Sequence, residues 1–425
     1  MHLNEETKVQ YGILAVMWLE FLWEFYLAIR QHRLCQKVTS VPKELKNVMS
    51  QETFDKARLY TLDKNSFSMI KDSISTVLSS IIIYCGFFHY FWVLADEWCP
   101  IHGEIAQSCM WLLILNSVST LTGMPFNVYY TFILEEKYGF NKQTVGFFIK
   151  DKIKSFVLSQ VLSVPISAFA IYIVQVGGDY FFVWLWLMVG IVVLILLTIY
   201  PAYIAPLFDK YTPLPEGELR TSIEALASEL KFPLGQLYVV EGSKRSAHSN
   251  AYFYGLFGVK RIVLFDTLIA KPESGGCNNE EVLAVLSHEL GHWKHGHVNK
   301  NLVIMQVNLF LMFAAFAMMF NYAPLYAALG FPVGMRPILI GLIAVVQFVM
   351  APYNALLSFL LTMLSRYFEF QADEFAVKLG KAPIKCPPTS LSTVDLITET
   401  SVGMIRICVC NHLPRLSICS VILFN

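Results

Sequence analysis

The sequence predicts an all-α polytopic membrane protein with seven transmembrane helices and a small α+β insertion. Of its 425 residues, 55% are hydrophobic and only 15% are charged, whereas soluble domains carry about 25% charged residues. Seven apolar stretches are long enough to cross the hydrocarbon core, and basic residues alternate between the segments that connect them. The net charge is zero, so no nucleic-acid partner is expected.

The predicted spans divide the chain into membrane and non-membrane regions. The first span follows an acidic start, without the basic residues or the small-residue cleavage site of a signal peptide, so we expect it to be retained. Spans one to five, with their cytoplasmic loops, are assigned to residues 1–200, and spans six and seven to residues 302–361. The seven apolar stretches lie approximately at residues 11–30, 74–95, 108–128, 156–176, 180–200, 302–320 and 337–361.

The distribution of Lys and Arg predicts the orientation. Nine of them lie between spans one and two, and five between spans three and four, whereas segments 96–107 and 175–179 contain none. The positive-inside rule therefore puts the N-terminus on the lumenal or exterior side and the segments after spans five and seven in the cytoplasm. Within the first span, Glu20 and Glu24 share a helix face, which indicates either a polar wall of an internal chamber or hydrated side chains near an interface.

Residues 201–301 form the predicted cytoplasmic insertion. Leu237–Glu241 and Arg261–Phe265 are expected to be strands, joined by a polar connection. A strand beside a metal-binding helix can hold a peptide by edge addition, with Asn250 or His248 fixing the peptide backbone. The alternative is a polar loop that caps a hairpin.

The segment Ser287–Trp293 contains an H-E-x-x-H motif. On a helix, His288 and His292 project from one face, so both imidazoles can bind one Zn²⁺, while Glu289 can act as general base. Asn278 and the acidic residues that follow it predict the start of this helix. The alternative is an ordinary amphipathic helix with exposed histidines.

A catalytic zinc keeps three protein ligands, so a third ligand is needed. His295 and His297 lie too far along the helix and are expected in a hydrated turn near the membrane.

The helix expected at residues 362–381 offers a better ligand, because Glu369 and Asp373 share one of its faces. Glu369 could complete the site and Asp373 could orient a ligating histidine. Alternatively, Arg366 pairs with Glu369 in an ordinary salt bridge.

Seven ordered segments give the chain, from about residue 10 to 382, a strong resemblance to the type I CaaX prenyl endopeptidases, a family of membrane zinc metalloproteases. The segments that carry the resemblance are Leu59–Lys64, Ile204–Lys210, Glu241–Gly255, Arg261–Asp266, Glu281–Trp293, Ser365–Asp373 and Lys378–Gly380.

This resemblance implies a hollow chamber enclosed by the seven helices, with a zinc site that faces inward near the cytoplasmic side. It implies removal of the C-terminal tripeptide of isoprenylated CaaX proteins, a second upstream cut in a prelamin-like substrate, and location in the endoplasmic reticulum or inner nuclear membrane. His288, His292 and Glu369 resemble the ligands, Glu289 the base, and Asp373 a proton donor or a partner of a ligand. Asn250, with its neighbours His248 and Tyr252, resembles the substrate-binding segment.

The tail, residues 382–425, does not resemble the family and lacks its His-Pro-Pro segment. This departure predicts an alternative function, an impaired isoform that binds zinc and prenylated substrate without turnover. A seven-span receptor or transporter is the non-enzymatic alternative. Cys408, Cys410 and His412 suggest a second metal site, but their spacing fits no standard zinc module.

Overall fold

The computed structural model describes residues 4–41, 50–255, 258–269 and 276–380. The tail that was expected to diverge, with Cys408, Cys410 and His412, lies outside the described residues.

Six helices in the described chain are long and apolar enough to cross a membrane, and one bent pair adds a seventh when it is counted as a single span. The two parts of this pair meet at 59°. The all-α, seven-span fold class is thereby confirmed. The spans are α1 (Glu5–Lys37), α2 (Gln51–Tyr84), α4 with η2 (Glu104–Tyr129, Tyr130–Glu135), α5 (Val145–Val176), η3 to η5 with α6 (Gly178–Tyr180, Phe181–Ile199, Tyr200–Ile204, Ala205–Leu207), α9 (His297–Met319), and α11 with η8 and α12 (Ile338–Ala344, Val345–Val349, Ala351–Lys378).

The second span differs from its predicted position at 74–95. The membrane helix is α2, which ends at Tyr84, and the chain then turns into the separate helix α3 (Phe87–Trp98). Gly86 makes this turn with φ +67°, a left-handed conformation that strongly favours glycine. The residues on both sides of Gly86 are apolar, so a hydropathy profile predicts one continuous stretch and does not detect the turn between α2 and α3.

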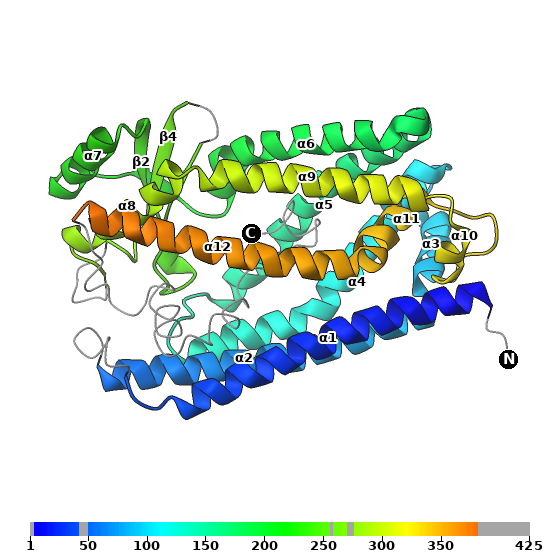
Figure 1. The fold of residues 1–425 in the computed structure, drawn as a ribbon, viewed down its shortest axis with the longest axis horizontal. Helices are drawn as coiled ribbons and strands as arrows, with labels where there is room; N and C mark the ends of the chain where they lie inside the picture. Colours follow the sequence, from blue (N-terminus) through cyan, green and yellow to red (C-terminus); the bar gives the residue numbers. More distant parts are fainter. Residues whose placement is uncertain (1–3, 42–49, 256–257, 270–275, 381–425) are drawn as a thin grey trace.

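The spans bury little of their surface inside the molecule. Only 6% of the most apolar window of α1 is buried, and the largest share, in α5 and α6, is 28%. Helices of a solid bundle would bury wide stripes, so this low burial is compatible with the hollow chamber that the resemblance implies. In Figure 1, α1 and α2 run side by side at one edge and α6 and α9 at the opposite edge, with α12 between them. On α1, Glu20 is half-buried and Glu24 is exposed.

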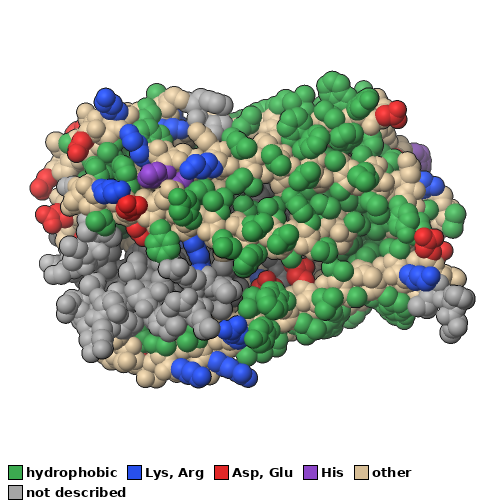
Figure 2. Space-filling model, in the orientation of Figure 1, with side chains coloured by type: hydrophobic (Ala, Val, Ile, Leu, Met, Phe, Trp, Pro, Cys, Tyr) green, Lys and Arg blue, Asp and Glu red, His purple; other side chains and the backbone are tan. Residues whose placement is uncertain are grey.

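Side-chain chemistry follows this architecture. Figure 2 shows hydrophobic side chains over the long helices, while charged side chains gather at the two ends, most of them at the end that contains the β-sheet. The short helices α3, α10 (Ala323–Ala327) and α11 lie at the opposite end (Figure 1).

The insertion folds into a four-stranded sheet with the order β1-β2-β4-β3. Strands β2 and β4 are parallel, and the two outer pairs are antiparallel. The two predicted strands are β2 and β4, and a third strand, β3, forms within the connection that was expected to be polar. The strands are β1 (Tyr211–Pro213), β2 (Leu234–Val240), β3 (Ala251–Tyr254) and β4 (Lys260–Phe265).

One hydrophobic core holds the sheet against two helices, α7 (Glu218–Leu230) and α8 (Asn279–Lys294). It includes Ile223 of α7, Ile262 and Leu264 of β4, and Leu286 and Leu290 of α8, all almost fully buried. Helix α8 therefore has a fixed position beside β3.

Candidate metal centre

The helix that carries the H-E-x-x-H motif begins with a capping box. Asn278 Oδ1 accepts a hydrogen bond from the Glu281 amide at 2.9 Å, and Glu281 Oε2 accepts one from the Asn278 amide at 2.8 Å. These bonds satisfy two backbone donors that a helix start leaves unpaired. The predicted start of the helix is confirmed.

Helices α8 and α12 approach closely at Gly291. A Cβ atom at this position would lie 3.0 Å from Ala372 Cα, 3.1 Å from its carbonyl oxygen and 3.3 Å from its Cβ. The absence of a side chain at Gly291 lets the backbone of α12 lie against the helix that carries His288 and His292. This contact brings Glu369, on α12, to the two histidines.

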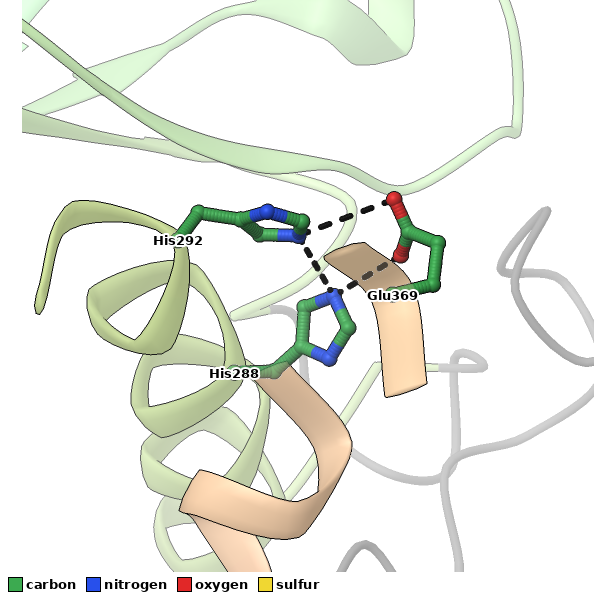
Figure 3. A group of neighbouring side chains, drawn as sticks. All are labelled: His288, His292 and Glu369. Carbon is green, nitrogen blue, oxygen red and sulfur yellow. Dashed lines mark hydrogen bonds and ion pairs between the residues drawn. The ribbon is translucent and has the colours of Figure 1, made fainter. Parts of the chain in front are cut away.

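Three side chains converge between the helices, as Figure 3 shows. His288 Nε2 lies 3.1 Å from His292 Nε2 and 3.2 Å from Glu369 Oε2, and His292 Nε2 lies 3.6 Å from Glu369 Oε1. Ligands at 2.0–2.1 Å from a tetrahedral ion would lie about 3.3 Å apart. His288, His292 and Glu369 could therefore hold one metal ion.

The electrostatics of the cluster favour a bound cation. Burial alone would lower the pKa of His288, but hydrogen bonds to Asp373 and Glu369 raise it to about 10. Positive charge is therefore stabilised at this point, whether it is carried by a proton or by a metal ion.

Asp373 holds His288 from the side away from Glu369. Its Oδ1 lies 2.7 Å from His288 Nδ1, which leaves Nε2 to face the other two donors. The predicted alternative, a salt bridge between Arg366 and Glu369, does not occur among the described ion pairs, where Glu369 faces His288 and His292.

His297 holds His292 in the same way, although the prediction for the position of His297 was wrong. His297 was expected in a hydrated turn, but it is only 2% exposed. Its Nδ1 lies 2.9 Å from His292 Nδ1, and its Nε2 lies 3.1 Å from Gln371 Oε1. The chain turns at Gly296 (φ +66°) between α8 and α9, so His297 begins a new helix and contacts His292 instead of lying farther along α8.

Glu289 occupies the position next to His288 and is partly enclosed at the cluster. Burial raises its pKa above the ordinary value, and the nearby histidines only partly offset this effect. A carboxylate with a raised pKa is a stronger base, as proton abstraction near neutral pH requires.

Strand β3 presents an open edge, because it is the last strand in the described sheet. The Phe265 amide donates to the Asn250 carbonyl at 3.0 Å, so Asn250 and Phe265 form a hydrogen-bonded pair. Such pairs alternate in antiparallel sheets, so the backbone groups of Ala251 and Phe253 point away from β4. The exposed side chain of Asn250 accepts from the Ala251 amide at 2.8 Å, at the start of this edge.

The side chains of His248 and Tyr252, both expected to bind substrate, are engaged elsewhere. The Tyr252 hydroxyl lies 3.0 Å from the Tyr211 hydroxyl. His248 Nε2 lies 3.4 Å from Glu135 Oε2, and the imidazole stacks on Phe140 at 4.6 Å. The structure therefore brings His288, Glu289, His292, Glu369 and Asp373 together, with Asn250 at the neighbouring edge, and directs His248 and Tyr252 away from that edge.

Sequence reasoning misplaced His297 and did not single out Gln371 or Glu135. Gly296, directly before His297, was the available signal that the first helix ends there. Glu135 and Gln371 have no local signal, because their partners lie far away in the sequence.

Two family models match the chain. Residues 31–210 match a model described as the CAAX prenyl protease N-terminal region with five membrane helices. Residues 213–400 match peptidase family M48. The second match ends within the segment that was expected to diverge.

Named relatives match most of the chain. CAAX prenyl protease 1 homolog of Homo sapiens is 49% identical over 414 residues, covering 89% of this chain and 87% of that protein. CAAX prenyl protease 1 of Saccharomyces cerevisiae is 36% identical over 405 residues, covering 89% and 88%.

The crystal structure of S. mikatae Ste24p matches with a TM-score of 0.83 and 32% identity, over 93% of this chain and 99% of that chain. Helices, candidate metal centre and relatives agree that the chain belongs to the CAAX prenyl protease 1 family of M48 membrane metalloproteases.

Proposed function

We propose that this protein is a zinc endopeptidase that removes the C-terminal tripeptide from isoprenylated CaaX proteins. The observation that carries the proposal is the convergence of donor atoms from His288, His292 and Glu369 in a helix pair beside the open edge of β3. The names of the relatives supply the substrate class.

Zinc is the proposed metal, because two imidazoles and one carboxylate form a known ligand set of catalytic zinc sites. A zinc ion held there supplies Lewis-acid chemistry, which polarises a carbonyl and makes water more acidic. Asp373 and His297 hold the two imidazoles by their Nδ1 atoms, so both Nε2 atoms would be available to hold the ion.

Glu289 is the proposed general base. It accepts a proton from the attacking water and returns it to the amine that leaves with the tripeptide. Its burial suits this role, because the raised pKa makes the carboxylate basic enough to take the proton. Of the two roles that the resemblance implies for Asp373, proton donor or partner of a ligand, the contact with His288 Nδ1 supports the partner that keeps His288 oriented.

The peptide is proposed to bind along β3 as an added strand. The outward carbonyl of Ala251 and the outward backbone groups of Phe253 would pair with it, and the exposed amide of Asn250, whose oxygen already accepts from the Ala251 amide, would donate to a peptide carbonyl. The isoprenyl group would lie among the membrane helices, since its apolar surface gains free energy on leaving water.

The site is proposed to face the cytoplasm. Lys142, between α4 and α5, donates its amide to the Arg245 carbonyl of the insertion, so the basic connection and the sheet lie at the same end of the molecule. The positive-inside rule assigns that end to the cytoplasm. The endoplasmic reticulum and the inner nuclear membrane are the proposed locations, and a second upstream cut in a prelamin-like substrate is part of the same proposal.

The alternative is an impaired isoform that binds zinc and prenylated substrate without cutting it. The observation that favours it is the sequence of residues 382–425, which lacks the His-Pro-Pro segment of the family. Grafting a family-type C-terminus after Lys381 separates the two, because restored cleavage would assign the defect to the tail.

The first test is cleavage of a farnesylated CaaX peptide by the purified full chain, with zinc measured on the same sample. We expect about one zinc per chain and release of the tripeptide. Glu289→Gln should retain the zinc and lose at least about a hundredfold in rate, because general-base catalysis contributes roughly 10²–10⁴-fold. An unchanged rate in Glu289→Gln would contradict the mechanism, and an absence of zinc in the wild-type chain would contradict the site. Zinc without cleavage would favour the impaired isoform.

A further inference from the structure

The segment that leads into β3 is attached to the ends of membrane helices. Residues 245–250 lie beside residues 140–142, which connect η2 to α5. The Ala247 amide donates to the Phe140 carbonyl at 3.0 Å, the Lys142 amide donates to the Arg245 carbonyl at 3.3 Å, and Asn141 forms a β-bridge with Ser246.

A buried carboxylate at the end of the third span completes this attachment. Glu135, the last residue of η2, is 7% exposed. Its Oε1 accepts a hydrogen bond from the Tyr60 hydroxyl of α2 at 2.6 Å, and its Oε2 lies 3.4 Å from His248 Nε2. The His248 imidazole also stacks on Phe140. One carboxylate thus joins two membrane helices to the segment before β3.

The backbone of residues 248–250 is hydrogen-bonded to the sheet, so the position of His248 also fixes the start of β3. The Thr267 hydroxyl donates to the His248 carbonyl at 3.1 Å, and the Phe265 amide donates to the Asn250 carbonyl two residues later. The next residue, Ala251, begins the open edge of β3. Strand β3 packs against α8, the helix that carries His288 and His292. A shift of His248 would pull on β3 and so move the peptide-binding edge relative to the metal centre.

We propose that His248 and Glu135 are positioning residues, which hold β3 in the register that a peptide needs to reach the metal centre. His248 acts through Glu135 and Phe140 and does not contact the substrate. This inference rests on the proposed function, since it assumes that the peptide binds along β3.

The test compares two farnesylated CaaX peptides, one with several residues upstream of the prenylated cysteine and one that begins at that cysteine. Glu135→Gln keeps an acceptor for Tyr60 but removes the charge that faces His248. His248→Phe keeps a ring on Phe140 but removes the ring nitrogen, and His248→Gln restores a donor. Lys137→Gln is the matched control, because Lys137 lies two residues from Glu135 but pairs with Asp63 on the surface.

We expect Glu135→Gln and His248→Phe each to raise KM for the long peptide by about tenfold, the size of one lost hydrogen bond to a charged group. The value of kcat and the zinc content should stay within about twofold, since the metal centre is intact. The short peptide should be affected much less, His248→Gln should recover most of the loss, and the control should match wild type. The double variant should be no worse than the worse single variant.

Additive losses in the double variant would overturn the inference and indicate that His248 contacts the substrate directly. Equal losses for both peptides would also overturn it. If the wild-type chain cleaves both peptides and the variants have the same KM as wild type, this inference alone is overturned. If the wild-type chain cleaves neither peptide, the proposed function is overturned as well. If Glu135→Gln does not yield folded protein, His248→Phe carries the same comparison.

Discussion

His297 is the residue that most clearly extends the metal centre beyond its three candidate ligands. Its imidazole is stacked on Phe368 at 4.0 Å and joins His292 to Gln371 in one hydrogen-bonded chain. Gln371 in turn donates to the Tyr367 hydroxyl at 3.1 Å. The orientation of His292 is therefore set by α9 and α12 as well as by its own helix.

Replacing His297 should weaken metal binding without removing a ligand. We expect His297→Phe to lower zinc affinity about 10- to 100-fold, as is typical when the partner of a ligating histidine is lost. Competition with a chelator measures this directly. His295→Phe is the matched control, because that histidine is exposed on the same turn. Equal effects of the two replacements would show that His297 does not hold His292.

At the scale of elements, the contact between α8 and α12 creates the site. Each helix carries only part of the donor set, and their backbones must come close enough for Glu369 to reach the two histidines. Gly291 permits this approach, since Ala372 occupies the space that a side chain would need. The buried Ala372 and Ala376 continue the small surface of α12 in this contact.

Gly291→Ala should push the two helices apart. We expect a loss of about 1–3 kcal/mol in stability, the usual cost of overpacking, and a lower zinc content, because the carboxylate moves away from the imidazoles. The thermal midpoint and bound zinc are the measurements. Gly146→Ala, in α5, meets no atom within 4 Å of the added Cβ and should be neutral or slightly stabilising. A Gly291→Ala protein with the zinc content and midpoint of this control would refute the packing argument.

At the scale of the molecule, the insertion is fastened to the membrane helices by Arg245. Its guanidinium makes two hydrogen bonds to Asp151 of α5, at 2.9 and 2.8 Å, and one to Asp209 at 2.6 Å. All three side chains are half-buried. A planar guanidinium can bind both aspartates at once, which a lysine ammonium cannot reproduce.

Arg245→Lys should therefore loosen the sheet from the helices while leaving the candidate ligands in place. We expect faster hydrogen exchange in β2 and β3 and a loss of about 1–3 kcal/mol in stability, with zinc retained at high zinc concentration. Arg220→Lys is the control, because Arg220 pairs with Glu216 and Glu224 at the exposed surface of α7, where such pairs contribute little. Unchanged exchange in Arg245→Lys would show that the fastening lies elsewhere.

The sequence by itself determined the features that depend on near neighbours along the chain. Apolar length predicted the spans, and the spacing of His288 and His292 placed both on one face of α8, because helical geometry repeats every few residues. The start of α8 followed from Asn278 and Glu281 for the same reason. The same spacing argument placed Glu369 and Asp373 on one helix face, and the resemblance supported their roles, but neither showed how that helix meets α8.

Only the tertiary structure decided how distant segments meet. The turn at Gly86 ended the second span early, and the turn at Gly296 brought His297 into contact with His292. The end of the third span placed Glu135 against His248. These contacts depend on where the chain reverses and on which helices pack together. Hydropathy and residue spacing report local conformation, so neither contains that information.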